Sequence, residues 1–301
     1  MPDFSHPSAR QDSDAVKPTE TYAERFQKVF EYIDRHLDEP ISVSQLSEVA
    51  HFSVFHFHRQ FTQYTGVPVF RYVQLMRLRR ASYLLAFNRN EKVVDVALGV
   101  GFEAPESFAR AFKNTFGQSP TAFREQPDWQ EWHAKFTFQT SEPIQAMEIE
   151  IVQSDAIRVA VLEHHGHPDL VSNTVARFIE WRKASSLSPI TSSKTFGIVY
   201  NDPETVSPEE FRYDVCGSIA AEIPDNPQGV RNGWIPAGRC ARVRHHGSHT
   251  RLGPVVQHLY REWLPPSGEE LRDFPVYFHF LNLLSSTPEH ELETDVYLPL
   301  K

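Results

Sequence analysis

The sequence predicts two unlike domains: an all-α domain with two helix-turn-helix units, and an α+β domain built from two related halves. Two internal repeats lead to this prediction. SVFHFHRQFTQYTG at 53–66 recurs in altered form as APESFARAFKNTFG at 104–117. VAVLEHHGHPDLVSNTVARFIEW at 159–181 recurs as CARVRHHGSHTRLGPVVQHLYREW at 240–263, with one residue inserted. Between the two pairs, near residue 147, the apolar period changes from that of helices to that of strands.

Length and composition limit the classes of protein to which the chain can belong. Its 301 residues, 40% of them hydrophobic, are enough for two or three compact domains. No run of about 18 apolar residues occurs, so we expect no transmembrane helix and no membrane partner. The two cysteines, Cys216 and Cys240, form no CxxC motif, which favours a reducing cytoplasm. Residues 1–19 are polar and lack the apolar segment of a signal peptide, and we expect a disordered tail there.

The net charge of −9 argues at first against a nucleic-acid partner, but the charge is unevenly distributed. Residues 20–128 carry 13 Lys and Arg against 13 Asp and Glu, whereas residues 129–301 carry a net charge of −8. The cations of the neutral part cluster, as at Arg77, Arg79 and Arg80. A neutral domain with local basic patches can still bind DNA, with an affinity that falls steeply as salt rises.

Each copy of the first repeat contains a Phe-x-Arg-x-Phe core with a glycine five residues after the last Phe (Phe57, Arg59, Phe61 and Gly66; Phe108, Arg110, Phe112 and Gly117). Phe residues four positions apart share one face of a helix and leave the Arg to the side. A short apolar helix and a tight break precede each copy. This order is typical of a helix-turn-helix unit, in which the second helix enters the major groove of DNA.

The rest of the first domain is predicted from apolar periodicity and capping residues. An amphipathic helix is expected from Thr21 to Leu37, and a long helix from Pro68 to Phe87 separates the two units. Ser53 is a candidate cap for the first reading helix, and Pro105 suits the first turn of the second. Gly101 fits a turn that needs a positive φ.

The run from VSQLSEVAHF to GFEAPESFARAFKNTFGQSPTAFRE resembles the AraC family of transcription regulators over about 105 residues. The resemblance implies an all-α domain of seven helices over 20–126, whose two reading helices enter successive major grooves of double-stranded DNA. It also implies the outward positions of these helices, which are Phe55, His56, His58 and Arg59 in the first and Pro105, Glu106, Ala109 and Arg110 in the second. Arg can donate to guanine, and Glu can accept from cytosine. The second helix offers fewer polar groups, so we expect it to position the protein more than to read sequence.

The second domain is expected over 147–301, after a linker at 127–146 that contains Pro127 and Pro143. EIEIV and IRVAVLE alternate like strands, HHG follows, and LVSNTVARFIEWRKA has helical spacing. Because the strand–HHG–helix order recurs, we expect two α+β halves related by a pseudo-twofold axis, with a ligand cleft at their seam.

This part is similar to the GyrI-like effector-binding domain. The residues that carry the similarity are the HHG repeat, FGIVYNDPETVSPEEFRYDVC at 196–216, IPAGRCARVRHHG at 235–247 and the tail FPVYFHFLN…ELETDVYLPLK. The similarity implies a hydrophobic cleft for small organic effectors, which are often cations in this family. Members that bind cations, or that hydrolyse strained electrophiles, place a Glu where this chain has Phe278.

A ring face attracts a cation less strongly than a carboxylate does, so we expect a neutral or aromatic effector here. Glu163 and Glu222 are the acidic residues that could replace the missing carboxylate. The candidate wall residues of the cleft are Tyr200, Trp234, Tyr277, Phe278 and Phe280, and core packing explains each of them about as well.

No catalytic, metal or cofactor site is predicted. The dense histidines at 164–167 and 245–249 lack the spacing and the acidic or thiolate partners of a metal site, and Ser248 lacks a nucleophile elbow. The sequence therefore predicts a cytoplasmic, ligand-responsive transcription regulator that is not an enzyme and that has RNA polymerase as a further partner. Two alternatives stay open: a GyrI-like hydrolase fused to a DNA-binding domain, and a second domain that acts as a protein-interaction module.

Overall fold

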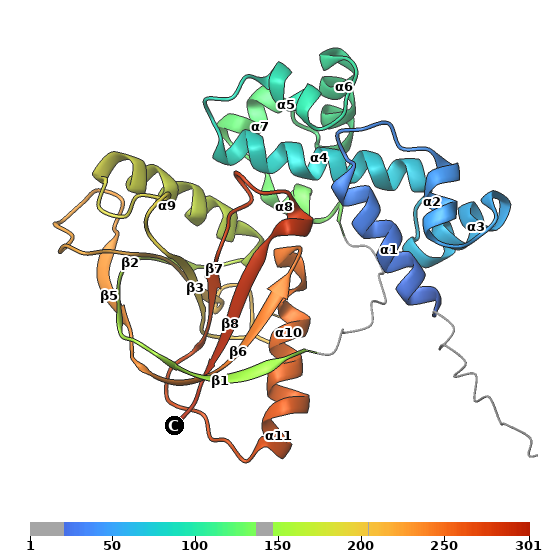
Figure 1. Cartoon of the computed structure of the whole chain (residues 1–301). Coiled ribbons are helices and arrows are strands. Elements are labelled where there is room, and N and C mark those ends of the chain that lie inside the picture. The colour runs from blue at the N-terminus through green and yellow to red at the C-terminus, as the bar shows by residue number, and fades with distance from the viewer. Residues whose placement is uncertain (1–20, 137–146, 204) are drawn as a thin grey trace, which may run out of the picture.

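The computed structural model describes residues 21–136, 147–203 and 205–301. The predicted tail at 1–19 lies outside these ranges. Within them the chain forms a helical part and a strongly curved sheet with helices on one side, and the two parts touch (Figure 1). None of the helices in the described ranges is long and apolar enough to cross a membrane.

The helical part begins with seven helices. They are α1 (Tyr22–Arg35), α2 (Val43–Val49), α3 (Val54–Thr65), α4 (Val69–Phe87), α5 (Val93–Gly99), α6 (Pro105–Phe116) and α7 (Pro120–Glu125). The first helices start at side-chain caps: Thr21 and Ser42 each form a capping box, and Ser53 accepts from the backbone of His56. Both reading helices end at a left-handed glycine, Gly66 or Gly117.

Two apolar cores lie on either side of α4. The first joins α1, α2 and α3 through Phe26, Phe57 and Phe61, and the second joins α5, α6 and α7 through Phe108 and Phe112. Helix α4 contributes to both cores, since its length of 19 residues exposes buried side chains to each in turn. The long helix predicted from the sequence therefore acts as a shared support for the two helix-turn-helix units.

The turn between α5 and α6 has one position that only glycine can occupy. Gly101 has φ +83°, and a Cβ added there would lie 2.3 Å from the carbonyl oxygen of Leu37. Arg77 of α4 donates to the carbonyls of Leu37 and Glu39 at the same place, both at 2.7 Å. The Gly101 turn thus rests directly on the end of α1 and on α4, which fixes the second unit against the first.

Part of the predicted linker is packed structure. Residues 129–133 form α8 (Trp129–His133), and its two tryptophans are each only 1% exposed. They pack on Phe123 of α7 and on Tyr83 and Phe87 of α4. The prediction of a linker was wrong for this half, because two large aromatic side chains bury enough surface to hold a single helical turn in place. Residues 137–146 lie outside the described ranges.

The second part contains one antiparallel sheet of eight strands. The strands are β1 (Ile149–Ser154), β2 (Ile157–His165), β3 (Thr195–Val199), β4 (Arg212–Ser218), β5 (Arg231–Ile235), β6 (Gly238–His246), β7 (Val276–Phe280) and β8 (Glu293–Pro299). Their order across the sheet is β1-β6-β8-β7-β3-β4-β2-β5. The order reads the same from either edge when β1 to β4 are exchanged with β5 to β8. Each half of the chain therefore gives its first strand to the edge of the other half.

Helices cover one face of this sheet. Helix α9 (Val171–Ser185) packs on Ala160, Leu162 and Val215, and α10 (Leu252–His258) packs on Val243 and Val296. These residues lie in one row across the strands, so both helices lie on the same face. A π-helical turn (Leu259–Trp263) and α11 (Leu264–Ser267) follow α10. This turn accommodates the residue by which the second copy of the repeat is longer.

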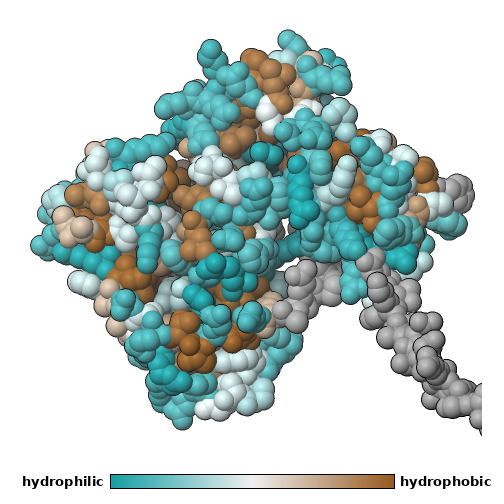
Figure 2. All heavy atoms as spheres, viewed as in Figure 1, coloured by the Kyte–Doolittle hydropathy of each residue, from teal (hydrophilic) through white to brown (hydrophobic). Residues whose placement is uncertain are grey.

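The helical part docks on the sheet domain through α1, α4 and α8. Short 3₁₀ turns receive them: η1 (Pro168–Leu170), η2 (His249–Arg251) and η4 (Glu289–Glu291). Val175, Ala176 and Ile179 of α9 pack against the core of the second helix-turn-helix unit. The view in Figure 2 shows small separate apolar patches among polar side chains on this side of the molecule.

Candidate functional sites: reading helices and interdomain cavity

The two reading helices present equivalent faces at a constant offset of 51 residues. Phe57 and Phe61 of α3 are fully buried, as are Phe108 and Phe112 of α6. With about 100° between successive residues, the opposite face of α3 carries residues 55, 56, 59 and 63, and that of α6 carries 106, 107, 110 and 114. Figure 1 places both helices on the side of the helical part that faces away from the sheet.

The predicted reading residues fall into two groups. His56, Arg59, Glu106 and Arg110 are exposed on these outward faces. His58 is exposed but lies at the flank of α3, where its ring is 6.2 Å from that of Phe70. Pro105 and Ala109 are half-buried at the flank of α6. Phe55 lies at an outward position of α3, but its side chain is outside the described part.

The outward faces also contain three exposed polar residues that the sequence prediction omitted: Gln63, Ser107 and Asn114. The repeat itself contained the signal that would have found them. Position 107 is equivalent to position 56, and Asn114 is equivalent to Gln63, so an amide lies at the same place on both helices. Each face thus offers an Arg and an amide, the two side-chain types that make bidentate contacts with guanine and adenine.

The HHG motifs form two matching turns at an offset of 81 residues. Gly166 and Gly247 have φ of +117° and +100°. His164 Nε2 lies 3.1 Å from the carbonyl oxygen of His167, and His245 Nε2 lies 3.0 Å from that of Ser248. Burial lowers the pKa of both His164 and His245, so each ring is neutral near pH 7. These histidines close a turn from strand to 3₁₀ helix, which accounts for their presence without a metal.

The same offset holds elsewhere in the domain. Asn201 accepts from the backbone of Arg212 and donates to Glu210, and Asn282 makes the same two bonds to Glu293 and Glu291. Gly197 of β3 is likewise equivalent to Phe278 of β7, and these two residues are paired directly across the centre of the sheet. The centre of the sheet is therefore the place where the two halves meet.

The five predicted wall residues of the effector cleft do not converge. Phe278 and Phe280 lie on the face that α9 and α10 cover, and Phe278 is packed in the core beneath α10. Tyr277 lies on the opposite face, stacked on Tyr297 at 4.8 Å. Tyr200 is also away from the helices, where it donates to Asp214 at 2.7 Å, and Trp234 is exposed on the edge strand β5. Successive residues of a strand face opposite sides, which a list of nearby aromatic residues ignores.

The acidic residues considered as substitutes for a carboxylate at position 278 lie elsewhere. Glu163 is on the face opposite the helices and forms ion pairs with Arg212, at 2.9 Å, and with Arg231. Glu222 is largely exposed and lies 3.9 Å from Arg158. Neither residue lies beside Phe278.

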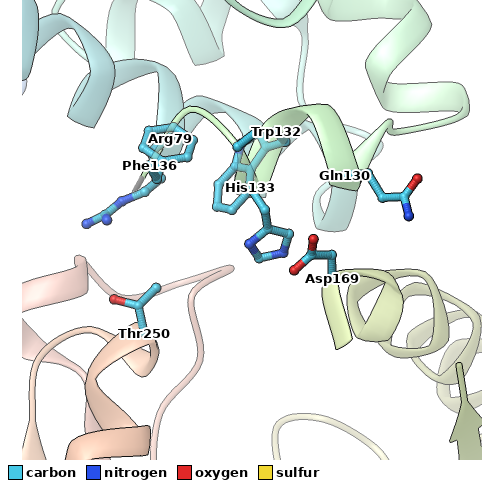
Figure 3. Close-up of a pocket in the computed structure, with 8 residues that line it drawn as sticks. Arg79, Gln130, Trp132, His133, Phe136, Asp169 and Thr250 are labelled. Carbon is cyan, nitrogen blue, oxygen red and sulfur yellow. The ribbon is translucent and has the colours of Figure 1, made fainter. Parts of the chain in front are cut away.

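A cavity of about 390 Å³ lies between the helical part and the sheet domain. Arg79 of α4 and the α8 segment with Trp132, His133 and Phe136 line one side, as Figure 3 shows. Asp169 of η1 and Thr250 of η2 line the other side. Asp169 and Thr250 are equivalent at the offset of 81 residues, so the cavity lies over the seam of the two halves.

The comparisons with known proteins agree with this arrangement. Residues 147–301 match the GyrI-like small molecule binding domain. The chain belongs to this family. Residues 46–126 match a helix-turn-helix domain, here of the AraC type. The GyrI-like domain is 46% identical over 154 residues to the probable transcriptional regulator YgiV of Escherichia coli K12, which covers 51% of this chain and 96% of YgiV.

The AraC-type domain has relatives of its own. It is 38% identical over 103 residues to YbfP, an uncharacterized HTH-type transcriptional regulator of Bacillus subtilis, covering 34% of this chain and 35% of YbfP. It is 32% identical over 98 residues to the right origin-binding protein of Escherichia coli K12, covering 33% of this chain and 34% of that protein. The chain is thus a transcription regulator that combines a DNA-binding AraC-type domain with a GyrI-like small-molecule-binding domain.

Charged groups connect the GyrI-like domain to the AraC-type domain beside the cavity. Arg79 donates to Glu289 at 2.6 Å, and both side chains are nearly buried. Burial opposes the charge of Arg79, but Glu289 and the phenols of Tyr83 and Tyr72 favour it, and the pKa of Arg79 is raised. Ser248 also donates to Glu289. The two domains therefore meet through a buried ion pair, which is far more costly to break than a pair at the surface.

Proposed function

We propose that the chain is a ligand-responsive regulator whose helices α3 and α6 enter two successive major grooves on one side of the DNA. The observation that carries this proposal is the repetition of the outward face at an offset of 51 residues, with Arg59 and Arg110 at equivalent exposed positions. Helix α4 joins the cores of the two units, so the reading helices are held by one rigid element. Adjacent grooves on one side of the duplex are about 34 Å apart.

The DNA-reading residues we propose are Phe55, His56, Arg59 and Gln63 in α3 and Glu106, Ser107, Arg110 and Asn114 in α6. His58, Pro105 and Ala109 lie at the flanks, where contacts with the sugar–phosphate backbone are expected. The domain limits that fit this function are 20–126 for DNA binding and 147–301 for the effector, with α8 in the connection between them.

A footprint on the selected operator tests the two-groove model. We expect protection of two major-groove segments one helical turn apart, and loss of one segment in each of the variants Arg59→Ala and Arg110→Ala. Lys113→Ala is a suitable control, because Lys113 is exposed at the edge of the same face of α6. Protection of a single groove by the native protein would contradict the model.

The GyrI-like domain is proposed to bind a neutral or aromatic organic effector and to have no catalytic role. Its two halves, related by the offset of 81 residues, are proposed to form a pseudo-twofold pair. Position 278, where cation-binding and hydrolytic members place a Glu, holds a Phe packed beneath α10. No carboxylate is therefore available there to attract a cation or to act as a general base. A partnership with RNA polymerase remains a prediction, to be checked by transcription from the operator in a purified system.

A further inference from the structure

The cavity between the two domains has features of a ligand site that the sequence did not predict. It lies over the seam of the GyrI-like halves, where Asp169 and Thr250 occupy equivalent positions. It is closed from above by α8 and α4, which belong to the DNA-binding side (Figure 3). A volume of about 390 Å³ is in the range of small-molecule sites in proteins.

Two aromatic side chains give the cavity an apolar wall. Trp132 is 1% exposed, and its ring lies 4.5 Å from that of Phe136. Phe136 in turn lies beneath the guanidinium of Arg79, at 5.8 Å. A flat ring bound against these groups would bury apolar area on both of its faces, as aromatic-lined sites do.

Two buried donors on this wall lack an acceptor among the described residues. They are Nε1 of Trp132 and Nε of Arg79. A buried N–H without a partner is costly, and a ligand oxygen that accepts from it recovers that cost. On the opposite side, the carboxylate of Asp169 and the hydroxyl of Thr250 can accept from a ligand hydroxyl.

The charges of the cavity argue for a neutral ligand. A cation would lie close to Arg79, and an anion would lie close to Asp169. Neither charge would find an unopposed partner, because Arg79 is already paired with Glu289. A neutral molecule with an acceptor at one end and a donor at the other suits both sides of the cavity.

We propose that the cavity binds a hydroxylated aromatic carbonyl compound, with its carbonyl oxygen on Trp132 and Arg79 and its hydroxyl on Asp169. The inference rests on the proposed effector function and specifies where and what the effector is. Because the ligand would touch α4, α8, η1 and η2 together, its binding energy depends on how the two domains are docked. Only such a difference in affinity between two arrangements can transmit a signal to the DNA-binding helices.

The test uses the full chain and three probes in calorimetric titrations: 4-hydroxybenzophenone, benzophenone and benzyltrimethylammonium. We expect the hydroxylated ketone to bind most tightly and the cation most weakly. Trp132→Phe should weaken binding of 4-hydroxybenzophenone about tenfold, by loss of one donor. Trp129→Phe is the matched control, since Trp129 lies in the same helix, is equally buried and also has an unpartnered Nε1, but does not line the cavity. It should change the dissociation constant less than twofold.

A second variant keeps the test independent of folding. Asp169 is partly exposed, and Asp169→Ala should remove the preference for the hydroxylated over the plain ketone, while Asp225→Ala, at an exposed site away from the cavity, should keep it. Equal weakening by the two tryptophan variants, tightest binding of the cation, or absence of binding of all three probes at millimolar concentration would overturn the proposal. The footprint on DNA is measured separately, so the two-groove model can stand while this site fails, and the reverse.

Discussion

The two helix-turn-helix units have equivalent helices, but different interactions hold them in place. In the first unit, Ser42 and Ser53 cap the helices with their side chains. In the second, α5 starts at Lys92 and α6 at Ala104, and neither residue makes a side-chain cap. The second unit instead shares its core with α8 and with α9 of the GyrI-like domain.

This difference indicates which unit the GyrI-like domain can influence. Local caps stabilise the first unit whether or not the domains are docked. The second unit relies on tertiary contacts that belong partly to the other domain. A change in docking should therefore alter the position or the stability of α6 more than that of α3, so that the second unit is the regulated one.

The largest expected effect comes from breaking the buried contact between the domains. Arg79→Met should lower the free energy of unfolding by about 3 kcal/mol, because it leaves Glu289 buried without its cation. The control Arg89→Met removes an exposed ion pair with Glu180 and should cost less than about 1 kcal/mol. Urea unfolding followed by tryptophan fluorescence measures both. Equal losses would show that the interdomain pair has no special weight.

The Gly101 turn should be nearly as sensitive. Gly101→Ala adds a Cβ that meets the Leu37 carbonyl at a positive φ, and we expect a loss of about 2–3 kcal/mol. Gly66→Ala and Gly117→Ala are controls with positive φ and open space around the new Cβ, and each should cost only about 1 kcal/mol. The comparison fails if all three variants unfold at the same urea concentration. His51 occupies the corresponding turn of the first unit at φ 53°, which a non-glycine residue tolerates because the surroundings are open.

The two arginines of the reading faces should separate the roles of the units in DNA binding. Arg59→Ala should cost about 1–3 kcal/mol of operator binding and relax the preference at one base pair. Arg110→Ala should weaken binding to operator and to random DNA more evenly, since the second helix is expected to position the protein. Fluorescence anisotropy at two salt concentrations measures both effects. A larger loss of sequence preference with Arg110→Ala would reverse the assignment.

The smallest effects should come from exchanging the caps. Ser53→Ala removes the cap of α3 and should destabilise the protein by about 1 kcal/mol. Ala104→Ser introduces a cap at an extended residue before α6 and should stabilise it by about 0.5 kcal/mol. Thermal unfolding of the two variants and of the double variant checks this. No gain from Ala104→Ser would mean that packing alone already fixes the start of α6.

The sequence predicts the local features of this structure well and the distant ones poorly. The Phe-x-Arg-x-Phe cores, the long helix α4 and the positive φ of Gly101 follow from spacing and from backbone sterics, and each is present. Helix α8 escaped prediction because five residues are too few to show a helical period.

The aromatic wall of the effector cleft failed for a different reason. Side chains such as Tyr277 and Phe278 are neighbours in sequence but lie on opposite faces of β7. The interdomain cavity could not be predicted at all, since it joins Arg79, Trp132 and Asp169, whose proximity depends on how two domains dock.

The exchange of the strands β1 and β5 sets the smallest piece of the GyrI-like domain that can exist alone. In a chain with only the first half, β1 would have no neighbour of its own, because its partner β6 belongs to the second half. Such a half could complete its sheet only by intertwining with another copy of itself. The present domain is therefore equivalent to an intertwined dimer written as one chain, and cutting it between β4 and β5 should give two fragments that remain clasped together.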